Sequence, residues 1–133
     1  MAQALARAQH LRISARKLRL VADLVRGKKV SEARDILRFT VKGGAPLLSK
    51  VLASAVANVE SVAAEKRQRV NSDDMVILRL EVNEGRTMNR FRPASRGRGV
   101  RIRKRSSHIE MVIGDPASRV ASARPSTAAR KEA

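Results

Sequence analysis

Residues 76–113 read VILRLEVNEGRTMNRFRPASRGRGVRIRKRSSHIEMVI, and this stretch decides the fold. Apolar and polar residues alternate at both of its ends, which predicts two strands that each turn one face toward a core. PASRGRG, at residues 93–99 between them, has the composition of a turn. The stretch therefore predicts a long β-hairpin at about 76–113 whose base belongs to a domain and whose tip does not. The apolar residues expected to anchor its base are Val76, Leu78, Leu80, Val82, Ile109, Met111 and Ile113.

The predicted hairpin is longer than the domain that carries it. A strand over residues 76–92 spans about 55 Å at ~3.3 Å per residue, whereas a domain of roughly 95 residues has a radius of gyration of only about 12 Å. Residues 86–105 also hold nine Arg and Lys residues and no acid. A lone two-stranded ribbon is marginal in water, and its like charges weaken it further. We therefore expect the arm to become well ordered only when a polyanion surrounds it.

The chain before residue 30 is predicted to form a short strand and a first helix. Residues 2–13 alternate weakly between apolar and polar side chains, which favours a strand. Ser14 can cap the helix that follows, and Gly27 stands where a left-handed residue ends a helix. The apolar stripe of this helix consists of Leu18, Leu20, Val21, Ala22, Leu24 and Val25.

Two further helices are predicted between residues 31 and 65. Ser31 is expected to open the first of them, and its apolar face continues as far as Val41. Pro46 suits the first turn of the second, which runs to about Glu65. Together with the hairpin, this pattern predicts an α+β fold. The apolar stripe of the longer helix consists of Leu48, Leu52, Ala55, Val59 and Val62.

The formal net charge of +17 is concentrated at the two ends of the chain. Residues 1–29 hold eight basic residues and one acid, and residues 85–133 hold thirteen basic residues and three acids. Residues 30–84 are balanced, with eight of each. Of the 29 basic residues 21 are Arg, whose flat guanidinium matches phosphate and stacks on bases. This distribution predicts that the ends bind nucleic acid.

The composition also limits the mode of binding and argues against a membrane partner. With no Trp or Tyr, and only Phe39 and Phe91, the chain cannot build an aromatic platform for bases, so phosphate contacts and shape should dominate. A basic protein of membrane surfaces normally carries Trp or Phe on an amphipathic face. The longest apolar run, residues 51–57, is interrupted by Ser54 and is too short to cross a bilayer.

We find no pattern of catalytic, metal-binding or cofactor-binding residues. His10 and His108 are far apart in the sequence, and the chain has no Cys. The adjacent acids at residues 73–74 are typical of a turn before a strand, and Gly97 and Gly99 serve the hairpin turn. We therefore expect no enzyme, no metal and no cofactor. An RNA-processing enzyme stays open only if carboxylates converge in the fold.

Each end of the chain could be something other than part of the folded domain. The first acid is Asp23, which is typical of an Arg-rich transit peptide, but this region merges directly into the predicted first helix. Residues 115–133 are rich in Ala, Ser, Pro and Arg and have no periodicity. We expect them to form a basic extension that is disordered or contacts RNA. One domain is therefore expected, at residues 1–114.

Three segments of the chain resemble the family of bacterial large-subunit ribosomal protein twenty-two. They read RISARKLRLVADLVRGKKVSEARDIL at 12–37, KVLASAVANVES at 50–61 and VNEGRTMNRFRPASRGRGVRIRKRSSHIEMVI at 82–113. The likeness runs from about residue 4 to residue 114, and RIRKRSSHI is its most specific part. It implies three helices packed on a small three-stranded antiparallel-type sheet, two strands of which are drawn out as the hairpin.

The resemblance also implies a function. Members of the family bind large-subunit ribosomal RNA in the cytoplasmic ribosome, contact neighbouring ribosomal proteins, and line the peptide exit tunnel with the hairpin tip, past which the nascent peptide moves. No homo-oligomer is expected. The architectural DNA-binding proteins are the alternative class, because their two-stranded arms carry a Pro at the tip and kink a duplex, and Pro93 beside Arg92 suits that role.

The resemblance assigns roles to individual residues. Two departures from many members are Ala15, where they have Pro, and Ala94-Ser95, where they have Arg-Ala, so the tip lacks one charge. The expected tunnel-lining tip consists of Arg90, Arg92, Pro93, Arg96, Gly97, Arg98, Gly99 and Arg101. The expected RNA-binding residues of the shaft are Arg86, Arg103, Lys104, Arg105, Ser106, Ser107 and His108. Those of the domain body are Arg12, Arg16, Lys17, Arg19, Arg26 and Lys28.

Overall fold

The structure, a computed structural model, describes residues 3–116, so most of the predicted C-terminal extension lies outside the described residues. The fold is α+β, with three helices and antiparallel strands, as predicted. Short 3₁₀ turns at Ser72–Asp74 and Ser95–Gly97 connect some of these elements. In chain order the main elements are β1 (Gln3–Leu11), α1 (Ala15–Val25), α2 (Val30–Phe39), α3 (Ala45–Glu65), β2 (Val76–Glu84), β3 (Met88–Pro93), β4 (Gly99–Lys104) and β5 (Ser107–Gly114).

A three-stranded antiparallel sheet organises the part of the chain that holds the helices, which we call the body. Its strand order is β1-β5-β2, so β5 is the central strand. Met111 of β5 pairs with Ala6 on one side and with Leu80 on the other. Ile109, Met111 and Ile113 are each no more than 1% exposed. The alternation seen in the sequence at the outer end of the hairpin is therefore the core-facing side of this central strand.

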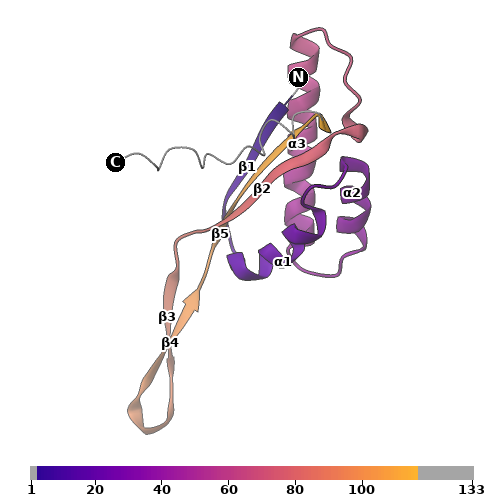
Figure 1. Cartoon of the computed structure of the whole chain (residues 1–133). Helices are drawn as coiled ribbons and strands as arrows, with labels where there is room; N and C mark the ends of the chain where they lie inside the picture. The colour runs from indigo at the N-terminus through magenta and orange to yellow at the C-terminus, as the bar shows by residue number, and fades with distance from the viewer. Residues whose placement is uncertain (1–2, 117–133) are drawn as a thin grey trace, which may run out of the picture.

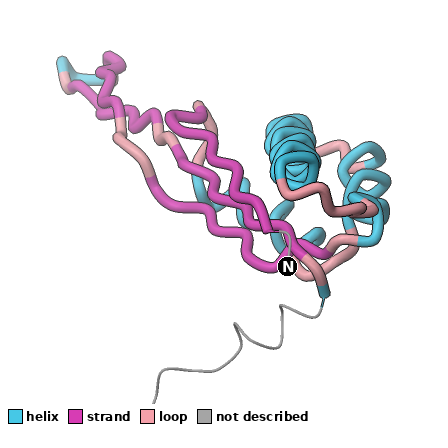
Figure 2. The backbone as a smooth tube through the Cα atoms, turned by 90° about the horizontal axis from the view of Figure 1, so that it is seen from above, coloured by secondary structure: helices cyan, strands magenta, loops and turns pink. Residues whose placement is uncertain are grey.

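Helices cover the core-facing side of the sheet. α3 packs against β1 and β5, and α1 packs against β2, as the views in Figures 1 and 2 show. Leu18, Leu48 and Leu52 from these helices are no more than 1% exposed. Burying a side chain of this size stabilises a fold by about 1.5–3 kcal/mol. This packing holds in place the sheet whose strands β2 and β5 lead into the arm.

Several predicted helix boundaries are confirmed. Ser14 precedes α1, and its hydroxyl oxygen accepts a hydrogen bond from the backbone N–H of Lys17. Gly27 follows α1 with a φ of 74°, in the left-handed region that a residue without a Cβ enters freely. Pro46 lies in the first turn of α3, which ends at Glu65. The short strand predicted within residues 2–13 is β1.

The predicted limits of α2 are wrong at both ends. The helix begins at Val30 and not at Ser31, because the chain pairs with β2 just before it: Val30 N–H donates to the Met75 carbonyl at 2.8 Å. This backbone pairing sets the start, and no side chain caps it. The helix ends at Phe39, and Val41, which the prediction placed on its apolar face, is 99% exposed.

The prediction that Leu78 faces the core is also wrong. In the register of β2 with β5, Ile77 pairs with Ile113 and Arg79 pairs with Val112, so Leu78 is an extra residue in a β-bulge. A bulge shifts the alternation by one residue. Ile77 is consequently fully buried, whereas Leu78 is only half-buried. The sequence pattern could not reveal this shift, because residues 76–78 are all apolar.

Strands β3 and β4 form a separate two-stranded sheet. We call residues 88–104 the arm, and Figure 1 shows it extending away from the helices. The sequence pattern predicted two uninterrupted strands, whereas each is divided where the arm meets the body. We call the two dividing segments, residues 85–87 and 105–106, the junction. At the tip, Arg96 and Gly97 turn the chain with φ values of 59° and 68°.

Among the described residues, α3 alone is long and apolar enough to cross a membrane by length and composition. The apolar run at residues 51–57, which is too short to cross a bilayer, is only part of this helix, Ala45–Glu65. The Leu48, Leu52 and Val59 side chains of the helix are buried against the rest of the body. The core helix of a soluble protein passes the same test, so this helix is weak evidence for a membrane span.

Candidate nucleic-acid interface

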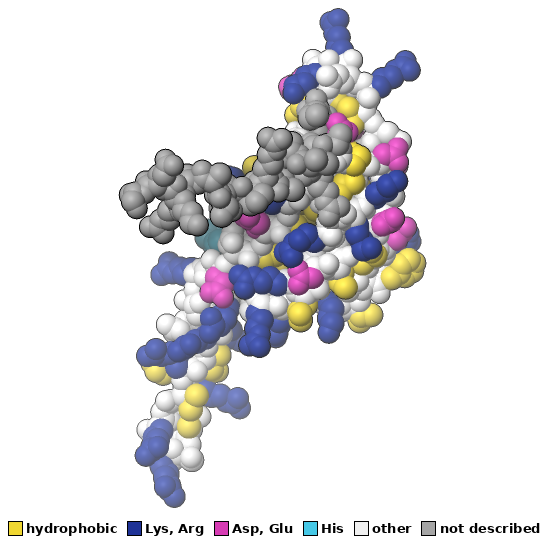
Figure 3. Space-filling model, viewed as in Figure 1, with side chains coloured by type: hydrophobic (Ala, Val, Ile, Leu, Met, Phe, Trp, Pro, Cys, Tyr) yellow, Lys and Arg dark blue, Asp and Glu magenta, His cyan; other side chains and the backbone are white. Residues whose placement is uncertain are grey.

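Cationic side chains cover the arm and the part of the body beside it. Figure 3 shows Lys and Arg along the arm as far as its tip, and on the neighbouring surface of the body, where a few acids are interspersed. The tip residues are all exposed, and Pro93 pairs with Gly99 where the turn closes. The predicted tip residues therefore lie together at the end of the arm: Arg92, Pro93, Arg96, Gly97, Arg98 and Gly99, with Arg90 and Arg101 next to them in the two strands.

The pairing of β3 with β4 shows which arm residues share a face. Residues directly opposite one another in antiparallel strands point to the same side. One face carries the pairs Met88–Lys104, Arg90–Ile102 and Arg92–Val100, and the other carries Asn89–Arg103 and Phe91–Arg101. Both faces are therefore cationic, so a polyanion can contact the arm from either side.

Three apolar side chains of the arm are exposed. Phe91 is 76% exposed, Val100 is 53% exposed and Met88 is 40% exposed. They lie among Arg and Lys side chains, so the arm offers an apolar surface as well as charge. The alternation of the sequence could have indicated that Val100 is exposed. The exposure of Phe91 has no signal in the sequence.

A groove brings the arm and the body together at the junction. It has a volume of about 550 Å³ and runs between the start of α1 and the two strands of the arm. Six cations from three separate stretches of sequence line it, and we call it the basic groove. Its lining residues are Arg12, Ile13, Ser14, Lys17, Met88, Arg90, Arg103, Lys104, Arg105 and Ser106.

The basic groove unites two sets of residues that the sequence analysis placed apart. Arg12 and Lys17 were assigned to the body, whereas Arg103, Lys104 and Arg105 were assigned to the shaft. The fold brings them around one space, so a phosphate backbone in the groove can contact both sets. Arg86 lies beside it, in the junction.

Arg19 and Arg26 have partners within the protein. The Arg19 guanidinium donates to the carbonyl oxygen of Val82 at 3.2 and 3.1 Å, and that of Arg26 donates to the carbonyl of Leu80 at 3.2 and 3.0 Å. Arg26 also pairs with Asp23. These bonds join α1 to the outer edge of β2. Both residues were expected to bind RNA, and the structure gives them a second, internal role that the sequence did not reveal.

On the opposite edge of the sheet, a side chain contacts β1 in the same way. The Asn58 side-chain amide of α3 donates to the Leu5 carbonyl at 3.0 Å. Both edge strands of the body sheet thus have backbone oxygens bonded by side chains from a neighbouring helix.

Two of the predicted RNA-binding residues, Ser106 and His108, form hydrogen bonds at or beside the junction. The Ser106 hydroxyl donates to the Arg86 carbonyl at 2.6 Å. His108 Nδ1 accepts from the backbone N–H of His10 at 3.0 Å, and the two imidazole rings stand nearly perpendicular at 4.9 Å. Ser107 is fully buried, so its hydroxyl is not presented on the surface. Of the remaining body residues, Arg16 and Lys28 are exposed.

Close packing at the junction requires a glycine. A Cβ added to Gly85 would lie 2.6 Å from Ser106 Oγ and 3.0 Å from His108 Nε2. The Gly85 N–H also donates to the Ser106 carbonyl at 2.9 Å. Within residues 3–116 no group of three or more His, Cys, Asp or Glu side chains could hold a metal ion.

A small α+β body with a basic groove and a cationic arm defines a nucleic-acid-binding protein. The model of the family described as ribosomal protein L22p/L17e matches residues 6–114. The large ribosomal subunit protein uL22 of Oceanobacillus iheyensis is 50% identical over 111 residues, which cover 84% of this chain and 94% of that protein. The chain therefore belongs to the ribosomal protein L22p/L17e family, and the resemblance seen in the sequence is confirmed. Membership decides against the DNA-binding alternative.

Proposed function

We propose that this protein binds large-subunit ribosomal RNA mainly through its basic groove and arm, and that the tip of the arm lines the peptide exit tunnel. As a member of its family, the chain is a structural protein of the large subunit in the cytoplasmic ribosome, and it serves translation. The basic groove carries the proposal, because cations from the body and the arm surround one space there.

Charge neutralisation is the proposed mechanism. Each phosphate that meets a Lys or Arg releases a condensed counterion, which favours binding at low salt. RNA segments that repel one another in isolation can then pack around the body and arm. Arg90 on one face of β3 and Arg103 on the opposite face of β4 allow separate RNA segments to approach from two sides.

The tip is proposed to face the nascent peptide. The side chains of the turn at Ser95–Gly97 are exposed. Arg96 and Arg98 make the turn cationic. It could therefore contact the RNA of the tunnel wall on one side and face a passing peptide on the other. Neighbouring ribosomal proteins are the other proposed partners.

We further propose that residues 1–114 act as one non-enzymatic domain without cofactor or metal, that the chain forms no homo-oligomer, and that residues 115–133 are an extension. The charge of the junction and arm supports the absence of a homo-oligomer, because two copies of so cationic a surface repel each other.

Ultraviolet crosslinking of the protein in intact ribosomes, followed by sequencing of the attached nucleic acid, tests the function. We expect large-subunit ribosomal RNA attached to peptides that contain Arg12, Lys17, Arg90 or Arg103. Crosslinks to DNA alone, or to RNA only through α3, would contradict the proposal.

A further inference from the structure

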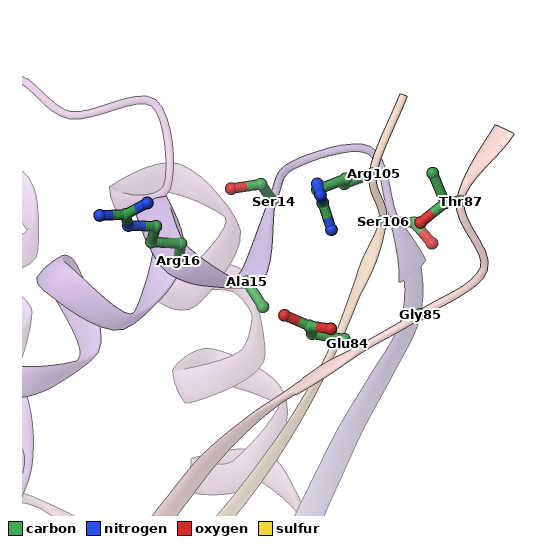
Figure 4. Close-up of a pocket in the computed structure, with 8 residues that line it drawn as sticks. All are labelled: Ser14, Ala15, Arg16, Glu84, Gly85, Thr87, Arg105 and Ser106. Carbon is green, nitrogen blue, oxygen red and sulfur yellow. The ribbon is translucent and has the colours of Figure 1, made fainter. Parts of the chain in front are cut away.

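A second, smaller space lies beside the basic groove. It has a volume of about 280 Å³ and lies where the start of α1 faces the junction. Figure 4 shows the Glu84 side chain of β2 and the Arg105 side chain of the junction pointing toward the start of α1, while Arg16 points away from Glu84. We call this space the Glu84 pocket. Its lining residues are Ser14, Ala15, Arg16, Glu84, Gly85, Thr87, Arg105 and Ser106.

Glu84 is an unusual residue for a surface that binds a polyanion. Among residues 3–116 its carboxylate forms no ion pair or hydrogen bond, although two Arg residues line the same pocket. Other carboxylates of the sheet are paired: Glu110 bonds Arg7 at 2.8 Å, and Glu81 bonds Arg79 at 2.6 Å. A free carboxylate repels phosphate, so its presence here favours a ligand group that donates hydrogen bonds.

The chemistry of the nucleobases narrows the ligand. A carboxylate offers two acceptor oxygens and no donor. The Watson–Crick edge of guanine places an N1–H beside an N2 amino group, so it can donate to both oxygens at once. Adenine, cytosine and uracil each present an acceptor on that edge, which would face the negative carboxylate. RNA is read mostly where unpaired bases expose these edges.

The polar residues around Glu84 suit the rest of a nucleotide. The Arg105 guanidinium, which has no partner within the described chain, can bind the phosphate. Ser106 Oγ donates to the Arg86 carbonyl and therefore keeps its lone pairs for a ribose hydroxyl. Thr87 adds a second hydroxyl. At about 280 Å³ the pocket lies just below the usual range for small-ligand sites, about 300–1,000 Å³, so it is far too small for a duplex.

The pocket and the basic groove are connected. Ser14, Arg105 and Ser106 line both spaces. An RNA strand whose phosphates follow the basic groove can therefore turn one unpaired base into the Glu84 pocket. Gly85 at the side of the pocket allows Ser106 to keep its position there, since an added Cβ would lie 2.6 Å from Ser106 Oγ.

We propose that the Glu84 pocket binds one unpaired guanine of the RNA, with the carboxylate accepting from N1–H and the N2 amino group. This inference rests on the proposed RNA function of the basic groove. Phosphate contacts fix position and carry no sequence information, whereas a base contact does. The Glu84 pocket would then supply a base-specific contact in an interface dominated by charge.

Fluorescence anisotropy with single-stranded oligouridine probes tests the proposal. The probes carry one central guanine, adenine or cytosine, or none. We expect the full-length protein to bind the guanine probe at least about fivefold more tightly than the others, as one bidentate base contact provides. Glu84→Gln should abolish this preference, because an amide replaces one acceptor oxygen with a donor.

Glu60→Gln on the exposed surface of α3 is the matched control. Glu60→Gln raises the net charge by as much as Glu84→Gln, so it reports the general gain in affinity for RNA that follows from losing one carboxylate. It should strengthen binding of every probe alike and keep the guanine preference. Equal affinity of the wild-type protein for the guanine and adenine probes would overturn the proposal, as would a preference that survives in Glu84→Gln. If no probe binds in a salt-dependent manner, the RNA function of the basic groove fails and the pocket fails with it.

Discussion

Arg26 donates two hydrogen bonds from its guanidinium to the carbonyl oxygen of Leu80, at 3.2 and 3.0 Å, and so ties α1 to the outer edge of β2. Arg19, seven residues earlier in α1, makes the same connection to Val82. Two residues that resemble surface cations in the sequence therefore help to hold the body together. This changes what their replacement should do.

Arg26→Ala should destabilise the free protein, because the bonds to Leu80 and the packing of the side-chain stem are lost. Bonds from charged groups contribute about 1.5–3 kcal/mol, and the partial exposure of Arg26 places the expected loss near the lower end. Urea unfolding of the free protein measures it. Arg38→Ala on α2 is the control: it removes the same charge from an exposed side chain and should change stability by less than about 0.5 kcal/mol. Equal losses in the two variants would mean that the bonds to β2 add nothing.

Gly85→Ala should disturb the junction, because the new Cβ would lie 2.6 Å from Ser106 Oγ. Overpacking of this kind costs about 1–3 kcal/mol. Thermal unfolding and amide chemical shifts around Ser106 and His108 report the change. Gly43→Ala has no atom within 4 Å of its added Cβ and should leave stability nearly unchanged. A Gly85 variant as stable as the Gly43 variant would show that the junction is loosely packed.

RNA affinity should fall steeply with salt. Each phosphate contact adds roughly 0.7–0.9 to the slope of log affinity against log salt concentration. Replacing Lys17 or Arg103 by Gln removes one cation from the basic groove and should lower the slope by about that amount for RNAs of any sequence. Lys50→Gln on α3, outside the groove, should leave the slope unchanged. A flat salt dependence in the wild type would mean that base contacts dominate.

Hydrogen exchange should distinguish the body from the arm in the free protein. Amides of β5 and α3 lie in or against the core and should be protected. Amides between Arg90 and Arg103 lie in a lone, self-repelling ribbon and should exchange quickly until RNA is bound. Strong protection of these arm amides without RNA would contradict the view that a polyanion orders the arm.

The tip and the shaft of the arm should differ in function. Replacing residues 94–98 by a short Asn-Gly turn removes four exposed residues and the half-buried Ala94, none of which belongs to the core, so folding and incorporation into large subunits should persist. Nascent-chain passage or the binding of tunnel-directed antibiotics should change instead.

The complementary variant reverses charge between the hairpin turn and the body, at Arg101 next to the tip and at Arg103 and Arg105 of the shaft. Arg101→Glu, Arg103→Glu and Arg105→Glu together convert three attractions for phosphate into three repulsions and should block incorporation. The amount of each variant in purified subunits is the measurement. If the tip deletion prevents assembly and the triple variant assembles, the proposed division of the arm is wrong.

Much of this fold follows from local chemistry. Ser14, Gly27 and Pro46 mark helix ends through bonds and backbone angles that depend only on neighbouring residues, so the sequence predicted them. The start of α2 and the bulge at Leu78 depend on pairing with distant strands. In an all-apolar run such as 76–78, period alone cannot decide which residue faces inward.

The candidate site divides in the same way. The charge of residues 86–105 was predicted from composition, because nine cations without an acid leave few other interpretations. The convergence of Lys17 with Arg103 is a property of the fold. The internal bonds of Arg19 and Arg26, and the burial of Ser107, likewise depend on which strand lies at the edge and which face meets the core.

The side chains that bond the edge strands of the body sheet matter most before the protein is incorporated into a ribosome. A newly made chain must stay soluble until it meets RNA, and an open strand edge is a template on which another copy can add. Asn58 bonds a carbonyl oxygen of β1, and Arg19 and Arg26 bond carbonyl oxygens of β2. Such a copy would need these backbone acceptors. Along the arm, whose edges carry no such caps in the described structure, mutual repulsion between guanidinium groups has the same effect. The charges that later draw RNA to the arm would thus first keep free copies of the protein apart.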